Sequence, residues 1–115
     1  MYKRQAFRDA GATLEATDYA DACPIETVAL EVASTNPTLR GATAEVFDSW
    51  LDALGALLVS EGLEEGPARA MALTVVSALE GAFILARTAR TTEALEACGD
   101  AMADLLEAAL AAGRR

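Results

Sequence analysis

Few side chains in this sequence could carry out acid–base or covalent catalysis, or hold a metal ion. Histidine is absent, which removes the commonest general acid or base and a common metal ligand. The single lysine, Lys3, falls in an expected tail, where no pocket supports Schiff-base chemistry. The sequence also has no Gly-rich phosphate loop and no Cys-x-x-Cys pair. We therefore expect no catalytic residue, no metal ion and no cofactor, in a protein that is not an enzyme.

Three ionisable side chains lie in otherwise apolar stretches, and each has two interpretations. Cys23, before Pro24, is either a small buried residue at a helix start or a redox sensor, and the first is favoured. Cys98 is interpreted in the same way, as a core or interface residue. Glu80 needs a charged or hydrogen-bonding partner, or contact with water, because burying an unpaired carboxylate costs free energy. Arg87, two turns on, is one candidate partner, so Glu80 is either half of an interface ion pair or a polar anchor for a ligand.

The charge of the chain argues against nucleic acid as a direct partner. Nine Lys and Arg residues face eighteen Asp and Glu residues, the formal net charge is −9, and the basic residues form no cluster that could bind phosphates. No run of 18 apolar residues is free of charge, so no membrane span is expected. The N-terminal MYKRQAFRD lacks the apolar segment of a secretory signal, and two lone cysteines suit a reducing compartment. We therefore expect a cytoplasmic protein.

The prolines and the apolar pattern predict an all-α fold. A proline stands at the expected start of three helices, and strand-like alternation is missing. We predict about five helices with short connections, which favour antiparallel neighbours in a helical bundle. They span residues 4–18, 24–34, 37–61, 67–90 and 92–112. The 115 residues make one domain, expected over 7–115, with residues 1–6 as a tail for which a non-native origin is one interpretation.

The helices expected over 37–61 and 67–90 bring large apolar side chains face to face. On each helix such residues recur one turn apart, and small residues such as Ala72 and Ala82 leave room beside them. We interpret these large residues either as plain core or as the lining of a cavity for a small hydrophobic molecule, closed at one end by a residue of 24–34. The candidate ligand-binding residues are Leu30, Phe47, Trp50, Leu54, Met71, Val75, Leu79 and Phe83.

A second pattern, of small side chains, predicts self-association. The helix over 67–90 is apolar nearly all round with one small-residue side, and the helix over 92–112 adds a flat alanine face. Such stripes let another helix backbone approach, although they also occur in the cores of monomers. Because five helices of this length cannot easily cover so much apolar surface, we expect a homodimer. The candidate interface residues are Thr74, Ser77, Ala78, Gly81, Ala97, Ala101 and Ala108.

Three stretches together resemble a known family. From about Phe7 to the end, the chain is similar to the C-terminal domain of TetR-family transcriptional regulators of the LmrA/YxaF-like group. The similarity rests on ACPIETVALEVASTNPTLR, VFDSWLDAL and VVSALEGAFILARTARTTEALE. The resemblance implies a helical domain that binds an effector and dimerises through its last two helices. It also implies a repressor in which a helix-turn-helix headpiece binds operator DNA.

The sequence departs from the family pattern in one respect, because no headpiece precedes the resembling stretches. We therefore expect either part of a longer regulator or a natural headless form, and no DNA binding by these residues themselves. Two functions stay open: a ligand-sensing, dimeric domain of a repressor, and a structural dimerisation module without a ligand. A preformed internal cavity would discriminate between them.

Overall fold

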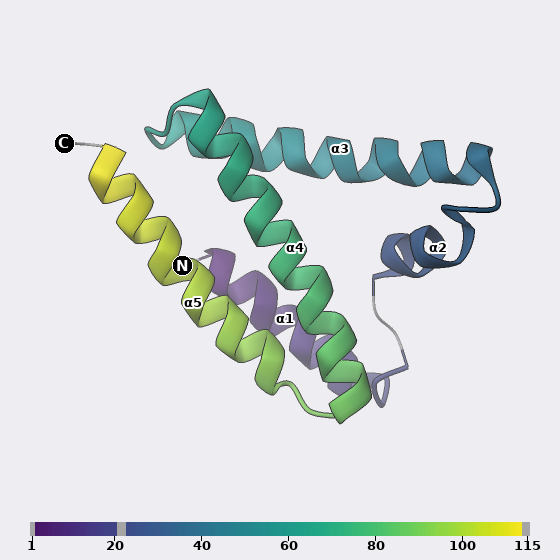
Figure 1. Cartoon of the computed structure of the whole chain (residues 1–115). Coiled ribbons are helices and arrows are strands. Elements are labelled where there is room, and N and C mark those ends of the chain that lie inside the picture. The colour runs from purple at the N-terminus through teal and green to yellow at the C-terminus, as the bar shows by residue number, and fades with distance from the viewer. Residues whose placement is uncertain (1, 21–22, 114–115) are drawn as a thin grey trace.

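The computed structural model describes residues 2–20 and 23–113, and the regular secondary structure within those ranges is helical (Figure 1). The helices are α1 (Tyr2–Ala16), α2 (Pro24–Val32), α3 (Pro37–Ser60), α4 (Glu65–Ala89) and α5 (Glu93–Gly113). The predicted all-α fold and the order of its elements are thereby confirmed. Residues 2–6, which were expected to form a tail, are part of α1.

The starts of the helices follow the predicted signals. Asn36 precedes α3, and its side-chain oxygen accepts a hydrogen bond from the Leu39 N–H at 3.0 Å. Pro24 and Pro37 open α2 and α3, where a missing N–H leaves no helical hydrogen bond unmade. α4 begins two residues before Pro67, which is tolerated in the first turn for the same reason.

Left-handed backbone conformations reverse the chain after several helices. Gly62, with φ 120°, follows α3 as predicted for its C-terminal end. Asp18 and Tyr19 follow α1 with φ 52° and 62°, and Arg90 follows α4 with φ 56°. Residues other than glycine adopt this conformation at a cost. Other contacts must therefore stabilise the turns that end α1 and α4.

The helices form an open arrangement, which Figure 1 shows from its broad side. α4 and α5 are antiparallel neighbours, and α1 packs against α5. α3 packs against α4 near the turn that joins them and then diverges, with α2 below its first half. The molecule measures 44 × 33 × 16 Å along its principal axes. The shortest dimension holds at most about two packed helices, so most helices keep one face without a covering helix.

The core lies where α1, α4 and α5 meet, with help from the end of α3. Its largest fully buried side chains are Phe7, Leu14, Leu58, Leu95 and Leu106. Phe7 packs over Gly99, where an added Cβ would lie 2.7 Å from the Phe7 Cβ. Glycine at position 99 is therefore what lets α1 approach α5 so closely. None of the residues of α2 is buried, so α2 is the helix that contributes least to the core.

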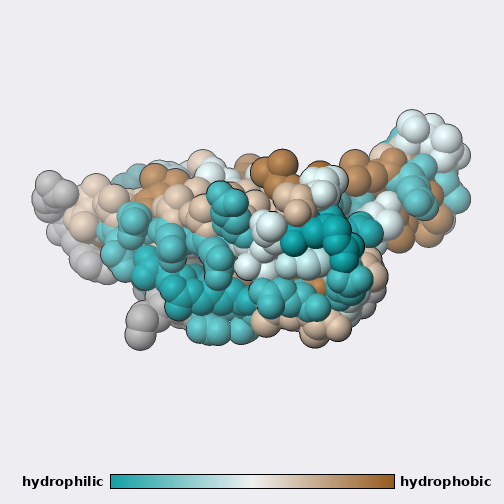
Figure 2. Space-filling view, turned by 90° about the horizontal axis from the view of Figure 1, so that it is seen from below, coloured by the Kyte–Doolittle hydropathy of each residue, from teal (hydrophilic) through white to brown (hydrophobic). Residues whose placement is uncertain are grey.

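The chain exposes more surface than a compact monomer of its mass. Its accessible surface is 6814 Å² for 12.0 kDa, against about 6000 Å² expected for a compact monomer of this size. Apolar side chains gather along one edge of the molecule and at the end formed by α2 and α3 (Figure 2). The excess is about 800 Å², the area that one partner buries in a standard protein–protein interface.

By length and composition alone, α4 could cross a membrane. The mean hydropathy of its most apolar stretch of 18 residues is 1.6, and 22 % of that stretch is buried inside the structure. The apolar stretch of α4 contains Glu80, so it is not a charge-free run of the kind that predicts a membrane span from sequence. One such helix is weak evidence for a membrane span, because the core helix of a globular protein has the same composition. The packing of α4 against both α3 and α5 gives its apolar residues another role.

Candidate functional site

Five of the predicted ligand-binding residues lie in or against the core on α3 and α4. One is buried, and the others are partly buried and packed on the core: Val75, and Leu54, Met71, Leu79 and Phe83. Side chains in these positions help to stabilise the packing of their helices on the core. The partly buried ones also keep some accessible surface, which a ligand could cover.

The other three predicted ligand-binding residues are more exposed. Phe47 and Trp50 pack edge to face on α3, with ring centroids 5.4 Å apart and ring planes at 88°. Trp50 is 39 % exposed. Leu30, on α2, is 71 % exposed and lies apart from this aromatic pair, in a separate depression of the surface.

That depression, the α2–α4 hollow, lies between the end of α1, α2 and the last turns of α4. Its volume is about 380 Å³, within the range of small-molecule sites. Leu30 and Ile84 give it apolar walls, and charged and hydroxyl groups complete the lining. The full set is Tyr19, Glu26, Thr27, Leu30, Glu31, Ile84, Arg87 and Thr88. Of these, the sequence analysis named Leu30 as a ligand-binding residue and Arg87 as a candidate partner of Glu80.

A second hollow, the α3–α4 groove, also measures about 380 Å³ and lies between the last turns of α3 and the first turns of α4. Its lining is Leu51, Asp52, Gly55, Ala56, Val59, Glu65, Ala68 and Arg69. Small residues, Gly55, Ala56 and Ala68, leave room in this groove, but they are not the small residues named in the sequence analysis, and none of the predicted ligand-binding residues lines it. Arg69 forms ion pairs across it with Asp48 at 3.6 Å and Asp52 at 3.0 Å.

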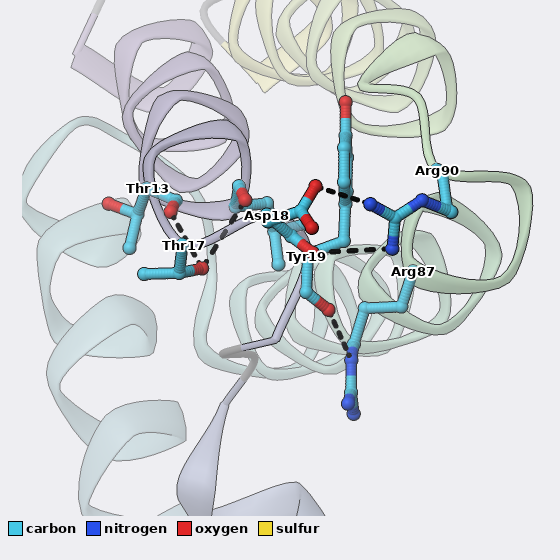
Figure 3. Close-up of polar contacts among 7 residues, drawn as sticks. Thr13, Thr17, Asp18, Tyr19, Arg87 and Arg90 are labelled. Atoms are coloured by element: carbon cyan, nitrogen blue, oxygen red, sulfur yellow. Dashed lines mark hydrogen bonds and ion pairs between the residues drawn. The ribbon is translucent and has the colours of Figure 1, made fainter.

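The turn after α1 forms one wall of the α2–α4 hollow, and two arginines of α4 and its C-terminal cap hold it. Arg87 Nε donates to the Tyr19 carbonyl at 3.2 Å, and Arg90 donates to the Asp18 carbonyl at 3.3 Å. Arg90 also pairs with the Asp18 carboxylate and lies over the Tyr19 ring, 5.4 Å from its centroid. Figure 3 shows both arginines directed at this turn. Together these contacts offset the cost of its left-handed residues.

Two carboxyl groups meet beside the hollow, Glu26 from α2 and Glu80 from α4. In each, the Oε2 atom is inaccessible to solvent and has no hydrogen-bond partner among the described residues when both acids are ionised. Burial, and then the hydrogen bond and charge of Glu80, raise the pKa of Glu26 to about 8, although Arg87 lowers it. Arg87, the candidate partner of Glu80 in the sequence, donates its Nε to Tyr19. Glu80 thus faces another acid.

Both cysteines are free thiols. Cys23 is buried at the start of α2, as predicted, and Cys98 is partly buried against the core. Burial raises the pKa of the Cys23 thiol, and the nearby Glu80 raises it further. The thiol is therefore a poor nucleophile at neutral pH. Within the ranges 2–20 and 23–113, no group of three or more acidic or cysteine side chains is placed to hold a metal ion.

The predicted interface residues lie on the outer faces of α4 and α5. One of them is partly buried and the rest are exposed: Ala78, and Thr74, Ser77, Gly81, Ala97, Ala101 and Ala108. A Cβ added at Gly81 would meet no atom within 4 Å. Larger apolar side chains on the same two helices, Leu85 and Leu105, are 59 % and 43 % exposed. Both helices therefore keep uncovered apolar and small-residue surface.

Comparison with known proteins gives the family of this domain. The family described as "Transcriptional regulator LmrA/YxaF-like, C-terminal domain" matches residues 3–101. An uncharacterised HTH-type transcriptional regulator, MT0206, of Mycobacterium tuberculosis (strain CDC 1551 / Oshkosh) is 32 % identical over 102 residues, covering 84 % of this chain and 53 % of that protein. The uncharacterised HTH-type regulator Rv0196 of strain ATCC 25618 / H37Rv matches with the same values. No solved structure matches the chain.

Proposed function

Because the chain belongs to the LmrA/YxaF-like family of TetR-type C-terminal domains of transcriptional regulators, we propose that it is the effector-binding and dimerisation domain of a cytoplasmic repressor. The chain spans about half the length, 53 %, of the curated relatives, which are named as HTH-type regulators. We assign operator binding to a helix-turn-helix part outside these residues, in line with their net charge of −9. In this proposal the domain performs no catalysis and needs no cofactor.

The observation that carries the proposal is the uncovered face of α4 and α5. The predicted interface residues on it are small and mostly exposed, and the chain exposes about 800 Å² more than a compact monomer would. A symmetric dimer through this face would bury an area of that size on each partner. The small side chains would allow the paired helices to approach closely, and Leu85 and Leu105 would supply apolar contact.

We place the effector, a small hydrophobic molecule, beside the partly buried residues of α3 and α4. Leu79 and Phe83 on α4 and the Phe47–Trp50 pair on α3 would supply apolar and aromatic contact. Binding would shift the population between two dimer geometries, without chemistry on the ligand.

Trp50 is the only tryptophan, so its emission tests this location directly. A panel of flat hydrophobic compounds is titrated against the wild-type chain, Phe83→Ala, and a control, Leu73→Ala, whose side chain is 45 % exposed on the same helix and lies outside the predicted interface residues. We expect one compound to change the emission saturably, with weaker binding to Phe83→Ala and unchanged binding to the control. If no compound binds, or if both variants bind like wild type, a structural dimerisation module is the better description. The core position of five predicted ligand residues favours that second function.

A further inference from the structure

α2 is the least anchored helix of the molecule. None of its nine residues is buried, and it packs mainly against the first half of α3. Arg40 of α3 donates to the carbonyl of Ala33, just after the last turn of α2, at 3.2 Å. Toward α4, the α2–α4 hollow separates the two helices over part of their length, and Glu26 and Glu80 meet beside it. The contact between these two acids is therefore an important part of what holds α2 against α4.

Two ionised carboxylates could not make that contact favourable. They would repel each other, and their inaccessible Oε2 atoms would have no hydrogen donor. One proton removes both problems, because a protonated carboxyl donates a hydrogen bond to a neighbouring carboxylate. We propose that Glu26 and Glu80 share one proton when α2 lies against α4, and that α2 is released from α4 as this proton passes to water, so that its attachment weakens with rising pH.

The groups around the pair are consistent with this arrangement. Burial and the neighbouring Glu80 raise the pKa of Glu26 from 4.5 to about 8, in spite of the positive charge of Arg87. The Cys23 thiol beside the pair has a raised pKa and stays uncharged at neutral pH. Of the other ionisable groups near α2, Tyr19 and Glu31 line the hollow, and Arg40 reaches the opposite end of the helix.

The pH range of the effect follows from proton linkage. When α2 is attached, Glu26 keeps its proton up to about pH 8, whereas a released and hydrated Glu26 loses it above about pH 4.5. Release therefore liberates a proton between these values, and the opening equilibrium rises by at most about tenfold per pH unit. Above about pH 8 both states are ionised and the pH dependence ends. The attachment is strongest in acid and weakest above pH 8, and it changes through neutral pH.

An isolated helix of nine residues is only marginally stable in water, so release of α2 from α4 should increase the hydrogen exchange of its amides. The exchange of a peptide spanning 24–32 is followed from pH 5 to pH 9, corrected for the intrinsic pH dependence of exchange, with a peptide of α5 as reference. Glu26→Gln keeps a hydrogen-bond donor between the helices without the titrating proton, and Glu80→Gln removes the neighbouring charge that adds to the effect of burial. Glu31→Gln is the matched control, because Glu31 lines the same hollow on the same helix. The infrared band of a protonated carboxyl, recorded at pH 7, detects the shared proton in the wild-type chain.

We expect wild-type protection of α2 to fall by up to about tenfold per unit between pH 5 and 8 and then to level off. Glu31→Gln should behave like wild type. Glu26→Gln should show protection that is independent of pH and should lack the infrared band, whereas Glu80→Gln should show the decline over a narrower pH range, because burial still raises the pKa of Glu26. Constant protection in the wild type, the same decline in Glu26→Gln, or no protonated carboxyl at pH 7 would each overturn the proposal. None of these readouts involves an effector or a dimer, so the result is separate from the proposed function.

Discussion

Replacing Gly81 by leucine tests whether this face of α4 is a dimer interface or only an exposed helix face. Gly81 lies in α4, and a Cβ at that position would meet no atom of the same chain within 4 Å. In the isolated protomer the leucine therefore has room. It should even stabilise the helix by up to about 1 kcal/mol, because glycine is among the poorest helix formers. Only a second chain packed on this face would make the substitution unfavourable.

The size of the effect follows from the symmetry of the proposed dimer. Overpacking one close helix contact costs about 1–3 kcal/mol, and a two-fold axis brings each substituted position into the interface twice. The loss is then about 2–6 kcal/mol per dimer, which raises the dissociation constant by a factor of about 30 or more. The same substitution should leave or slightly raise the thermal stability of the protomer.

Sedimentation equilibrium over a range of concentrations gives the dissociation constant, and circular dichroism melting reports the fold. The matched control is Gly41→Leu, on the exposed side of α3, where an added Cβ also meets no atom within 4 Å. We expect the wild type and the control to dimerise alike and Gly81→Leu to be monomeric but folded. A wild-type chain that is monomeric at tens of micromolar, or a Gly81→Leu chain that dimerises as well as the control, would refute the reasoning.

Two further outcomes are expected. Gly99→Ala should destabilise the chain by about 1–3 kcal/mol in thermal or urea unfolding, because its methyl group would lie 2.7 Å from the Phe7 Cβ. In the control, Gly41→Ala, the added methyl group meets no neighbouring atom, so the free energy of unfolding should stay the same or rise. Equal effects of the two substitutions would contradict the packing described. A fluorescence-anisotropy titration with duplex DNA at low salt should give no saturable binding, because the net charge is −9; salt-dependent saturation would contradict this interpretation of the surface.

Most of the helices could be predicted because the residues that start and end them act locally. Asn36 and Pro37 mark the start of α3 whatever the rest of the chain does, and Gly62 marks its end in the same way. The start of α1 could not be predicted in this way. Its first turns carry no cap or proline, and Arg4 reaches Asp100 at 3.0 Å only after α1 has packed on α5.

The candidate sites were harder to predict, because their residues meet only through the fold. The α2–α4 hollow depends on the turn at Asp18 and Tyr19, where two residues other than glycine adopt left-handed conformations that leave no clear signal in sequence. Glu80 could be recognised as a costly carboxylate in an apolar helix. Its neighbour Glu26 could not, because it lies on another helix and resembles there an ordinary acid in a first turn.

α4 carries both the proposed dimer face and the proposed carboxyl pair, on neighbouring sides of the helix. Glu80 and Arg87 are directed toward α2 and the turn after α1, whereas Gly81 and Ser77 belong to the face assigned to a second chain. A helix moves largely as a rigid element, so a shift that dimer formation imposes on one side reaches the other. If dimer formation changes the contact between α2 and α4, thermodynamic reciprocity requires that loss of the shared proton change the dimer affinity by the same factor. The position of α2 then becomes a variable to which protons and a second chain can both be coupled.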